Sequence, residues 1–314
     1  MAPREGKTPD SRLDPQVAHR LKELSLLVSL PQITVRLIQL ISQPNSSLQE
    51  LRGVVERDPA LTAKVISLAN STYYSLRNPT KTVERAITII GFQELGLLAL
   101  GLGLTETFNV SLAPKGFDVE SLWIHSLAVS WVSQRLANKL KSVESGEAMI
   151  AGLLHEIGTI VLVSKFPLLF QRLLDLILAG RPGLEAESVL KIRHEIVGHE
   201  LASLWKLPEG YQEAILCHHN PELAGRYKVL AAMVALADVL AHKIGFGLPT
   251  EVCEVDLGYS LKTLGLTPGD LQEFIRETIV AAKDILPLWR QLLKTGEPTT
   301  TQKSRFSALI PEKS

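Results

Sequence analysis

Residues 58–70 read Asp-Pro-Ala-Leu-Thr-Ala-Lys-Val-Ile-Ser-Leu-Ala-Asn, and this stretch decides the fold class. Aspartate is a favoured N-cap because its carboxylate accepts hydrogen bonds from the free amides of the first helical turn, and proline is favoured at the next position. Leucine, valine and isoleucine then recur at the period of a helix with one buried face. The stretch therefore predicts a short helix that begins at Pro59 and ends near Asn70.

The same helical signals extend in both directions along the chain. Pro31 is suited to the start of a helix, Ser46 or Ser47 to the cap of the next one, and Gly91 to the end of a helix over 83–90. Strand-like alternation is nearly absent, so the sequence predicts an all-α fold. Further helices are expected over 94–107, 120–140, 147–165, 168–179, 185–205, 208–218 and 227–243, with an irregular segment over 246–260 and two more helices after it.

A break with Pro114 and Gly116, over residues 111–118, separates two helical subdomains in this interpretation. Leu271 and Phe274 belong to an apolar helix face beyond them that is suited to docking. The expected organisation is a disordered tail over 1–20, an N-terminal subdomain over 21–110, a second subdomain over 119–245, a helical extension over 246–294 and a flexible tail over 295–314.

Composition excludes several classes of protein. Lysine plus arginine and aspartate plus glutamate are equal at 33 each, and no basic run with interleaved aromatic residues is visible, which argues against nucleic-acid binding. The most membrane-like stretch, residues 86–104, is interrupted by Gln93 and Glu94 and favours a buried helical hairpin over a membrane span. Two cysteines and no recognisable signal peptide predict a cytoplasmic protein without a disulfide framework.

The second half of the chain holds a series of histidines and carboxylates with the chemistry of metal ligands. Neutral imidazole and carboxylate suit transition metals, and such sites commonly gather their ligands from several elements. A single buried histidine is more often a hydrogen-bonded core residue, so the joint pattern carries the inference. The series consists of His125, His155, Glu156, His194, His218, His219 and Asp238.

Two stretches together resemble the HDOD domain, a bacterial signalling module related to HD-superfamily phosphohydrolases. The first is residues 58–66, followed by 68–71 and Tyr73-Tyr74; the second is Ala86-Ile87 leading to Ile90-Gly91. Leu30-Pro31 and Trp205-x-Leu207-Pro208, followed by His218-His219, also match. The resemblance covers residues 21–245 and implies two helical subdomains, of which the second is an HD-like helical bundle.

The resemblance also implies roles for the histidine series. His125 matches the first histidine of the active HD enzymes, His155-Glu156 their His-Asp doublet, and His194 to Gly198 a His-x-x-x-Gly element. Dinuclear relatives imply two clusters that hold one or two divalent ions, with iron, manganese or zinc as candidates. His125, His155 and Asp238 would form one cluster and His194, His218 and His219 the other, with the carboxylate of Glu156 as the bridge.

Three departures from the enzyme pattern leave the catalytic residues unassigned. Glu156 is one methylene longer than aspartate, which displaces the bridging oxygens. Thr159 stands where active relatives often carry Gly-Lys, and Asn220-Pro221 replaces the Gly-Tyr-Pro motif of cyclic di-GMP phosphodiesterases. His199 and His242 are interpreted as surface residues or as residues outside the ligand set.

The favoured interpretation is a regulatory protein that acts in a signalling pathway through a protein partner, with a retained or vestigial metal site. The alternative is a metal-dependent phosphohydrolase that acts on a nucleotide or another phosphoester. A small phosphorylated ligand remains a further candidate partner, whereas nucleic acid and membranes are not expected. Candidate interaction residues are Asp58, Asn70, Tyr73 and Tyr74, although helix capping and core packing explain most of that stretch equally well.

Overall fold

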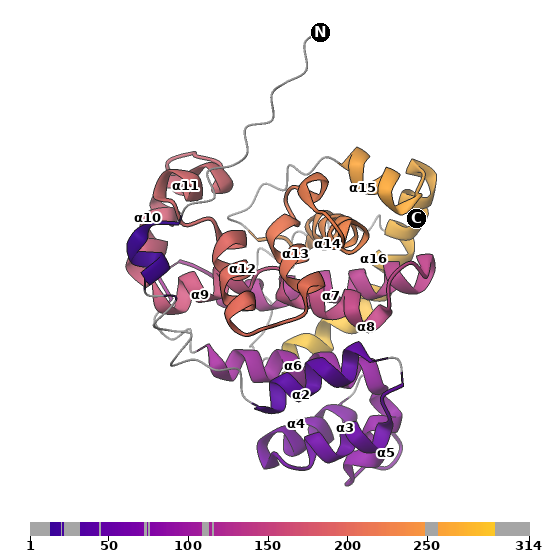
Figure 1. Ribbon diagram of the computed structural model, residues 1–314. Helices are drawn as coiled ribbons and strands as arrows, with labels where there is room; N and C mark the ends of the chain where they lie inside the picture. Colours follow the sequence, from indigo (N-terminus) through magenta and orange to yellow (C-terminus); the bar gives the residue numbers. More distant parts are fainter. Residues whose placement is uncertain are drawn as a thin grey trace, which may run out of the picture.

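The computed structural model describes residues 13–19, 21, 32–43, 45–71, 74, 76–108, 113–114, 116–248 and 257–292. Within these residues every regular element is a helix, as Figure 1 shows. The prediction of an all-α fold is therefore confirmed.

The N-terminal subdomain is a group of five short helices, drawn in indigo to purple in Figure 1. The carboxylate of Asp58 accepts a hydrogen bond of 3.0 Å from the Leu61 amide, and Ser47 forms a capping box with Glu50, so both predicted N-caps are present. Gly91, at φ 96°, separates the last two helices in the predicted hairpin. The helices are α2 (Gln32–Ser42), α3 (Leu48–Val55), α4 (Pro59–Ala69), α5 (Val83–Ile90) and α6 (Phe92–Thr107).

The second subdomain is built around three apolar helices that pack against one another, α7 (Val119–Leu140), α8 (Ser145–Leu154) and α14 (Lys228–Ala241). Of α14, every residue from Leu230 to Ala241 is buried, which makes this helix the centre of the subdomain. The remaining helices are α9 (Ile157–Lys165), α10 (Pro167–Leu178), α11 (Gly183–Leu190), α12 (His194–Leu204), α13 (Glu209–Cys217) and a 3₁₀ turn, η1 (Pro221–Leu223).

Two helices that the sequence predicts as continuous are broken in the structure, each beside residues of the histidine series. The helix expected over 147–165 ends at Leu154 and resumes at Ile157, so the His155-Glu156 doublet forms the junction. The helix expected over 185–205 is interrupted after Lys191, whose φ of 54° cannot continue a right-handed helix. Apolar residues continue through both breaks, which is why the periodicity did not indicate them.

The two subdomains are joined by close packing and by polar contacts. A β-carbon at Gly146 in α8 would lie 2.1 Å from the Ile41 carbonyl oxygen in α2, so only glycine permits this approach. The hydroxyls of Ser42 and Tyr211 lie 2.5 Å apart, and the Gln93 amide donates to Ser145 Oγ at 2.7 Å. The second subdomain therefore rests directly on α2 and α6 (Figure 1).

The chain segments outside the two subdomains depart in part from the predictions. Residues 15–19, expected in a disordered tail, are helical, and Val17 is buried. Within the segment expected to be irregular over 246–260, helix α15 (Leu257–Leu264) already begins at Leu257. The final helix, α16 (Pro268–Leu292), contacts both α4 and α7 and buries Leu271 and Phe274, so the extension docks through its apolar face.

Two helical stretches of the described chain are long and apolar enough to cross a membrane, Ser145–Lys165 and Lys228–Phe246. Their most apolar windows are 94% and 78% buried inside the fold, respectively. Both stretches form part of the core around the histidine series, and their position in the core accounts for their apolar character.

Helices α9 and α12 approach each other through a pair of facing glycines. A β-carbon at Gly158 would lie 1.9 Å from the His194 carbonyl oxygen and 2.8 Å from the Gly198 amide nitrogen. A β-carbon at Gly198 would in turn lie 3.2 Å from the Gly158 amide nitrogen. This contact fixes the distance between the doublet at the start of α9 and His194 at the start of α12.

We expect Gly158→Ala to lower the free energy of unfolding by about 1–3 kcal/mol, because the added methyl group must push α12 away. Gly53→Ala is the matched control, since a β-carbon added there, in the interior of α3, would have no other atom within 4 Å. The control should raise stability by up to about 1 kcal/mol. Urea denaturation of both variants measures the difference, and equal stabilities would contradict the close crossing.

Candidate metal centre

Five chain segments bring the predicted ligand residues to one buried place in the second subdomain. His125 comes from the middle of α7, the doublet from the α8–α9 junction, and His194 from the first position of α12. The remaining residues lie at the end of α13 and within α14. His219 is 8% exposed, and the other six are 0% exposed: His125, His155, Glu156, His194, His218 and Asp238.

One group of ligand atoms surrounds His194. Its Nε2 atom lies 3.2 Å from His218 Nε2, 3.1 Å from His219 Nε2 and 3.3 Å from Glu156 Oε1. One donor atom from each of these four residues lies within 4.8 Å of those from the others. The edge of a tetrahedral site with metal–nitrogen bonds of 2.0–2.1 Å is about 3.3 Å long, so these separations fit a shared ion.

A second group surrounds His125. Its Nε2 atom lies 3.1 Å from His155 Nε2 and 3.3 Å from Asp238 Oδ1. Donor atoms of His125, His155 and Glu156 lie mutually within 4.8 Å, and so do those of His125, Asp238 and His242. Glu156 thus belongs to the groups around both His125 and His194, which is the position expected of a bridging carboxylate.

Backbone carbonyls determine which ring nitrogen of three histidines faces the centre. Nδ1 of His125 lies 2.8 Å from the Phe246 carbonyl oxygen, Nδ1 of His155 lies 2.7 Å from that of Gly152, and Nδ1 of His218 lies 2.7 Å from that of Ile215. Because a carbonyl only accepts, each Nδ1 carries the hydrogen, and Nε2 of the neutral ring presents a lone pair. Lone pairs 3.1–3.2 Å apart repel unless a proton or a cation lies between them, so each pair of rings needs a shared proton or a metal ion.

The electrostatics of the buried carboxylates lead to the same conclusion. Burial alone would raise the pKa of Glu156, but the imidazoles around it, His194 foremost, hold that pKa well below its usual range. The pKa of Asp238 is lowered in the same way by His125, against the effect of burial. Neither carboxylate oxygen of Glu156 accepts a hydrogen bond from the described residues. Two ionised carboxylates in a dry core require positive charge beside them.

Two imidazoles lie in environments that favour their positively charged form. Burial alone would lower the pKa of His194, yet the carboxylates of Glu156 and Glu187 raise it well above the ordinary value. Asp238 similarly outweighs burial and raises the pKa of His125. By contrast, burial lowers the pKa of His155 to about 3, so that ring is neutral. Within each group the carboxylates thus favour positive charge on one imidazole, and a divalent ion at the same place would supply positive charge as well.

Three residues of the centre were not assigned to it from the sequence. Glu187 accepts hydrogen bonds from Nδ1 of His194 at 2.8 Å and from its backbone amide at 3.1 Å, so it orients the ring and caps α12. Glu195 is also buried, with Oε2 3.8 Å from His194 Nδ1. His242, interpreted from the sequence as peripheral, has Nε2 3.5 Å from Asp238 Oδ1. Only His242 offered a signal, because a spacing of four places it on the same helix face as Asp238.

The candidate interaction residues occupy a different part of the molecule, around the end of α4. Both amide atoms of the Asn70 side chain bond to the Thr80 backbone, at 2.9 Å to its oxygen and 2.7 Å to its nitrogen. Asp58 caps α4, and Tyr74 packs partly against the core. Tyr73 lies outside the described residues. Asp58 and Asn70 therefore have structural roles, and an interaction surface at this place stays a prediction.

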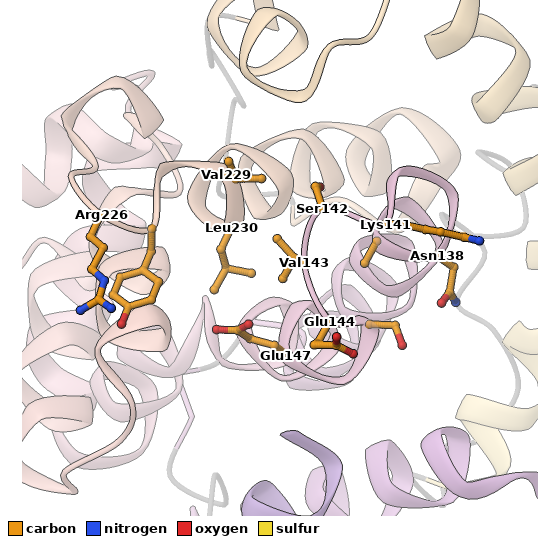
Figure 2. A pocket seen from close by; sticks show the side chains of 12 residues that line it. Asn138, Lys141, Ser142, Val143, Glu144, Glu147, Arg226, Val229 and Leu230 are labelled. Carbon is orange, nitrogen blue, oxygen red and sulfur yellow. The ribbon is translucent and has the colours of Figure 1, made fainter. Parts of the chain in front are cut away.

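The larger of the two described cavities, about 700 Å³, lies away from the centre, between the end of α7 and the starts of α8 and α14. Figure 2 shows Arg226 and Lys141 at its two ends, with the carboxylates of Glu144 and Glu147 between them. The smaller cavity, about 480 Å³, lies beside residues 14–17 and 165–172. No predicted metal ligand lines either cavity, so a small molecule could occupy them without reaching the centre.

The HDOD domain model matches residues 27–221. An uncharacterised protein of Treponema pallidum is 25% identical over 253 residues, which cover 78% of this chain and 47% of that protein. The chain therefore spans about half the length of this curated relative.

Two solved structures share the fold. A candidate signal transduction protein from Marinobacter aquaeolei has a TM-score of 0.77 and 25% identity, with 91% of this chain and 68% of that chain covered. A candidate phosphohydrolase from Shewanella amazonensis has a TM-score of 0.67 and 23% identity, with 90% and 99% covered. The fold is thus found in proteins described in both terms.

We expect the affinity of the centre for a divalent ion to fall as the pH is lowered from about 8 to about 6, because the ion must displace protons from imidazoles. The raised pKa of His194 means that its ring, which cannot bind a metal when protonated, keeps a proton above the usual range. Equilibrium dialysis against Zn²⁺ across this range measures the effect. An affinity independent of pH would contradict it.

Proposed function

Because the chain belongs to the HDOD family, we propose that it is a signal-transduction protein that acts through a protein partner and carries one or two metal ions in its second subdomain. The family match and the relative described as a signal transduction protein support the signalling role. The convergence of seven metal-ligand side chains supports the metal.

The burial of the centre favours a regulatory role over catalysis. Six of the seven predicted ligands are 0% exposed and the seventh is 8% exposed, so a phosphoester would have no path to the ions without movement of the surrounding helices. Catalysis by a metal also needs an open coordination position and a substrate site. A closed set of ligands is instead typical of a structural metal.

The predicted ligands would divide between two ions. His125, His155 and Asp238 would hold one ion, and His194, His218 and His219 the other, with Glu156 between them. The ions would supply positive charge to two buried carboxylates. Glu187 and the carbonyls of Gly152, Ile215 and Phe246 hold the rings in the ligating orientation. Metal binding would thereby tie together five segments of the subdomain that a partner recognises.

The alternative is a metal-dependent phosphohydrolase acting on a nucleotide or another phosphoester. The position of Glu156 among both groups of imidazoles favours it, since dinuclear hydrolysis needs a bridging ligand. Against it stand the closed centre and Thr159, which supplies no positive charge for a phosphate where active relatives often carry a lysine.

We expect His155→Ala to lose metal, and in EDTA to be less stable than the wild type by about 1–3 kcal/mol, because the change removes a buried ring and its hydrogen bond to the Gly152 carbonyl. The metal-bound wild type should melt at a higher temperature, because an ion that binds only the folded state stabilises it. His199→Ala is the matched control, since His199 is 30% exposed and lies outside the centre. A metal content in His155→Ala equal to that of the wild type would contradict its role as a ligand.

Elemental analysis of the purified protein, followed by phosphatase screening with Mn²⁺ or Fe²⁺, tests the proposed function against its alternative. Retained metal without turnover is the expected result. Turnover that disappears in His155→Ala and persists in His199→Ala would establish the hydrolase. An absence of metal under all reconstitution conditions would overturn the metal part of both proposals. Affinity capture from native lysate with wild type and His155→Ala then asks whether a partner depends on the centre.

A further inference from the structure

His242 lies one helical turn after Asp238, on the same face of the chain. Its Nε2 atom is 3.5 Å from Asp238 Oδ1, and its ring centroid is 5.1 Å from that of His125. Donor atoms of His125, Asp238 and His242 lie within 4.8 Å of one another, the same limit that defines the groups around Glu156. His242 is therefore placed as a ligand would be, although the matched HDOD pattern does not include it.

The helix changes its geometry directly after His242, whose own position follows from the regular spacing of four residues after Asp238. Helix α14 continues into a π-helical turn, η2 (His242–Phe246), in which Gly245 has a non-helical φ of 92°. Such turns are rare and occur frequently at functional sites. The widened turn also brings the Phe246 carbonyl to Nδ1 of His125. One short segment thus orients a predicted ligand and presents a second imidazole beside it.

Gly247 fixes the orientation of the His242 ring. A β-carbon at this position would lie 2.2 Å from His242 Nδ1, so the ring packs directly against the glycine backbone. With Nδ1 held on that side, Nε2 faces Asp238. The 3.5 Å between Nε2 and Asp238 Oδ1 is close to the edge of a tetrahedral metal site, about 3.3 Å, so both atoms lie where one ion could bind them.

We propose that His242 is a further ligand of the ion held by His125 and Asp238. This assignment rests on the proposed metal centre and deepens it. The side chain of His242 is 15% exposed, whereas those of His125 and Asp238 are 0% exposed, so His242 occupies the outer edge of the centre. Together with His125, His155 and Asp238, an imidazole there gives a four-residue ligand set of three nitrogens and one oxygen, which suits Zn²⁺, Fe²⁺ or Co²⁺.

Loading the full chain with Co²⁺ tests the assignment, because the visible absorption of Co²⁺ reports its ligands. We expect His242→Ala and His242→Gln to change the absorption spectrum and to weaken retention against a chelator by about tenfold or more. His199→Ala should match the wild type in both measurements. In EDTA, the His242 variants should melt as the wild type does, which separates ligation from a structural role; the glutamine variant preserves bulk if alanine does not fold.

The outcomes separate the two proposals. Unchanged Co²⁺ spectra and retention in both His242 variants, with metal lost in His155→Ala, would overturn the assignment of His242 and leave the centre intact. Equal destabilisation of the His242 variants with and without metal would also overturn the assignment. A wild-type protein that binds no Co²⁺ would overturn both the centre and the ligand.

Discussion

The structure depends on the placement of two ionised carboxylates, Glu156 and Asp238, inside an apolar core. A buried charge without a partner costs several kcal/mol, so the surrounding helices must present positive charge to it. Two imidazoles lie beside these carboxylates, with Nε2 of His125 3.3 Å from Asp238 and Nε2 of His194 3.3 Å from Glu156. The arrangement of α7, α9, α12 and α14 follows from this requirement as much as from apolar packing.

Glycine contacts make the arrangement geometrically specific. Gly158 lets α9 approach the backbone of α12, and Gly146 lets α8 approach the backbone of α2. The first contact positions the doublet against His194, and the second positions the same α8–α9 unit on the N-terminal subdomain. The centre and the subdomain interface therefore share one structural element, the α8–α9 unit. A displacement of the doublet would move α8, which also forms the interface.

The sequence predicted the helical class and the convergence region, because capping residues and apolar periodicity are local signals and the histidine pattern matched a family motif. It did not predict the breaks at His155-Glu156 and after Lys191, because apolar residues continue through both. Glu187 was missed because its contact with His194 depends on the second break. His242 was underestimated because its ring orientation depends on the contact with Gly247, which no periodicity reveals, although its spacing of four from Asp238 was a signal.

The donors of the centre are spread from α7 to α14, and this spacing has a consequence for biosynthesis. A nascent chain emerges from the ribosome from its N-terminus, so the N-terminal helices can pack long before Asp238 has been made. Until α14 has been made, His125 lacks Asp238, whose carboxylate lies 3.3 Å from its Nε2 atom in the folded chain. Capture of an ion would thus be a late step in maturation, and a truncated product ending before α14 would lack a complete centre.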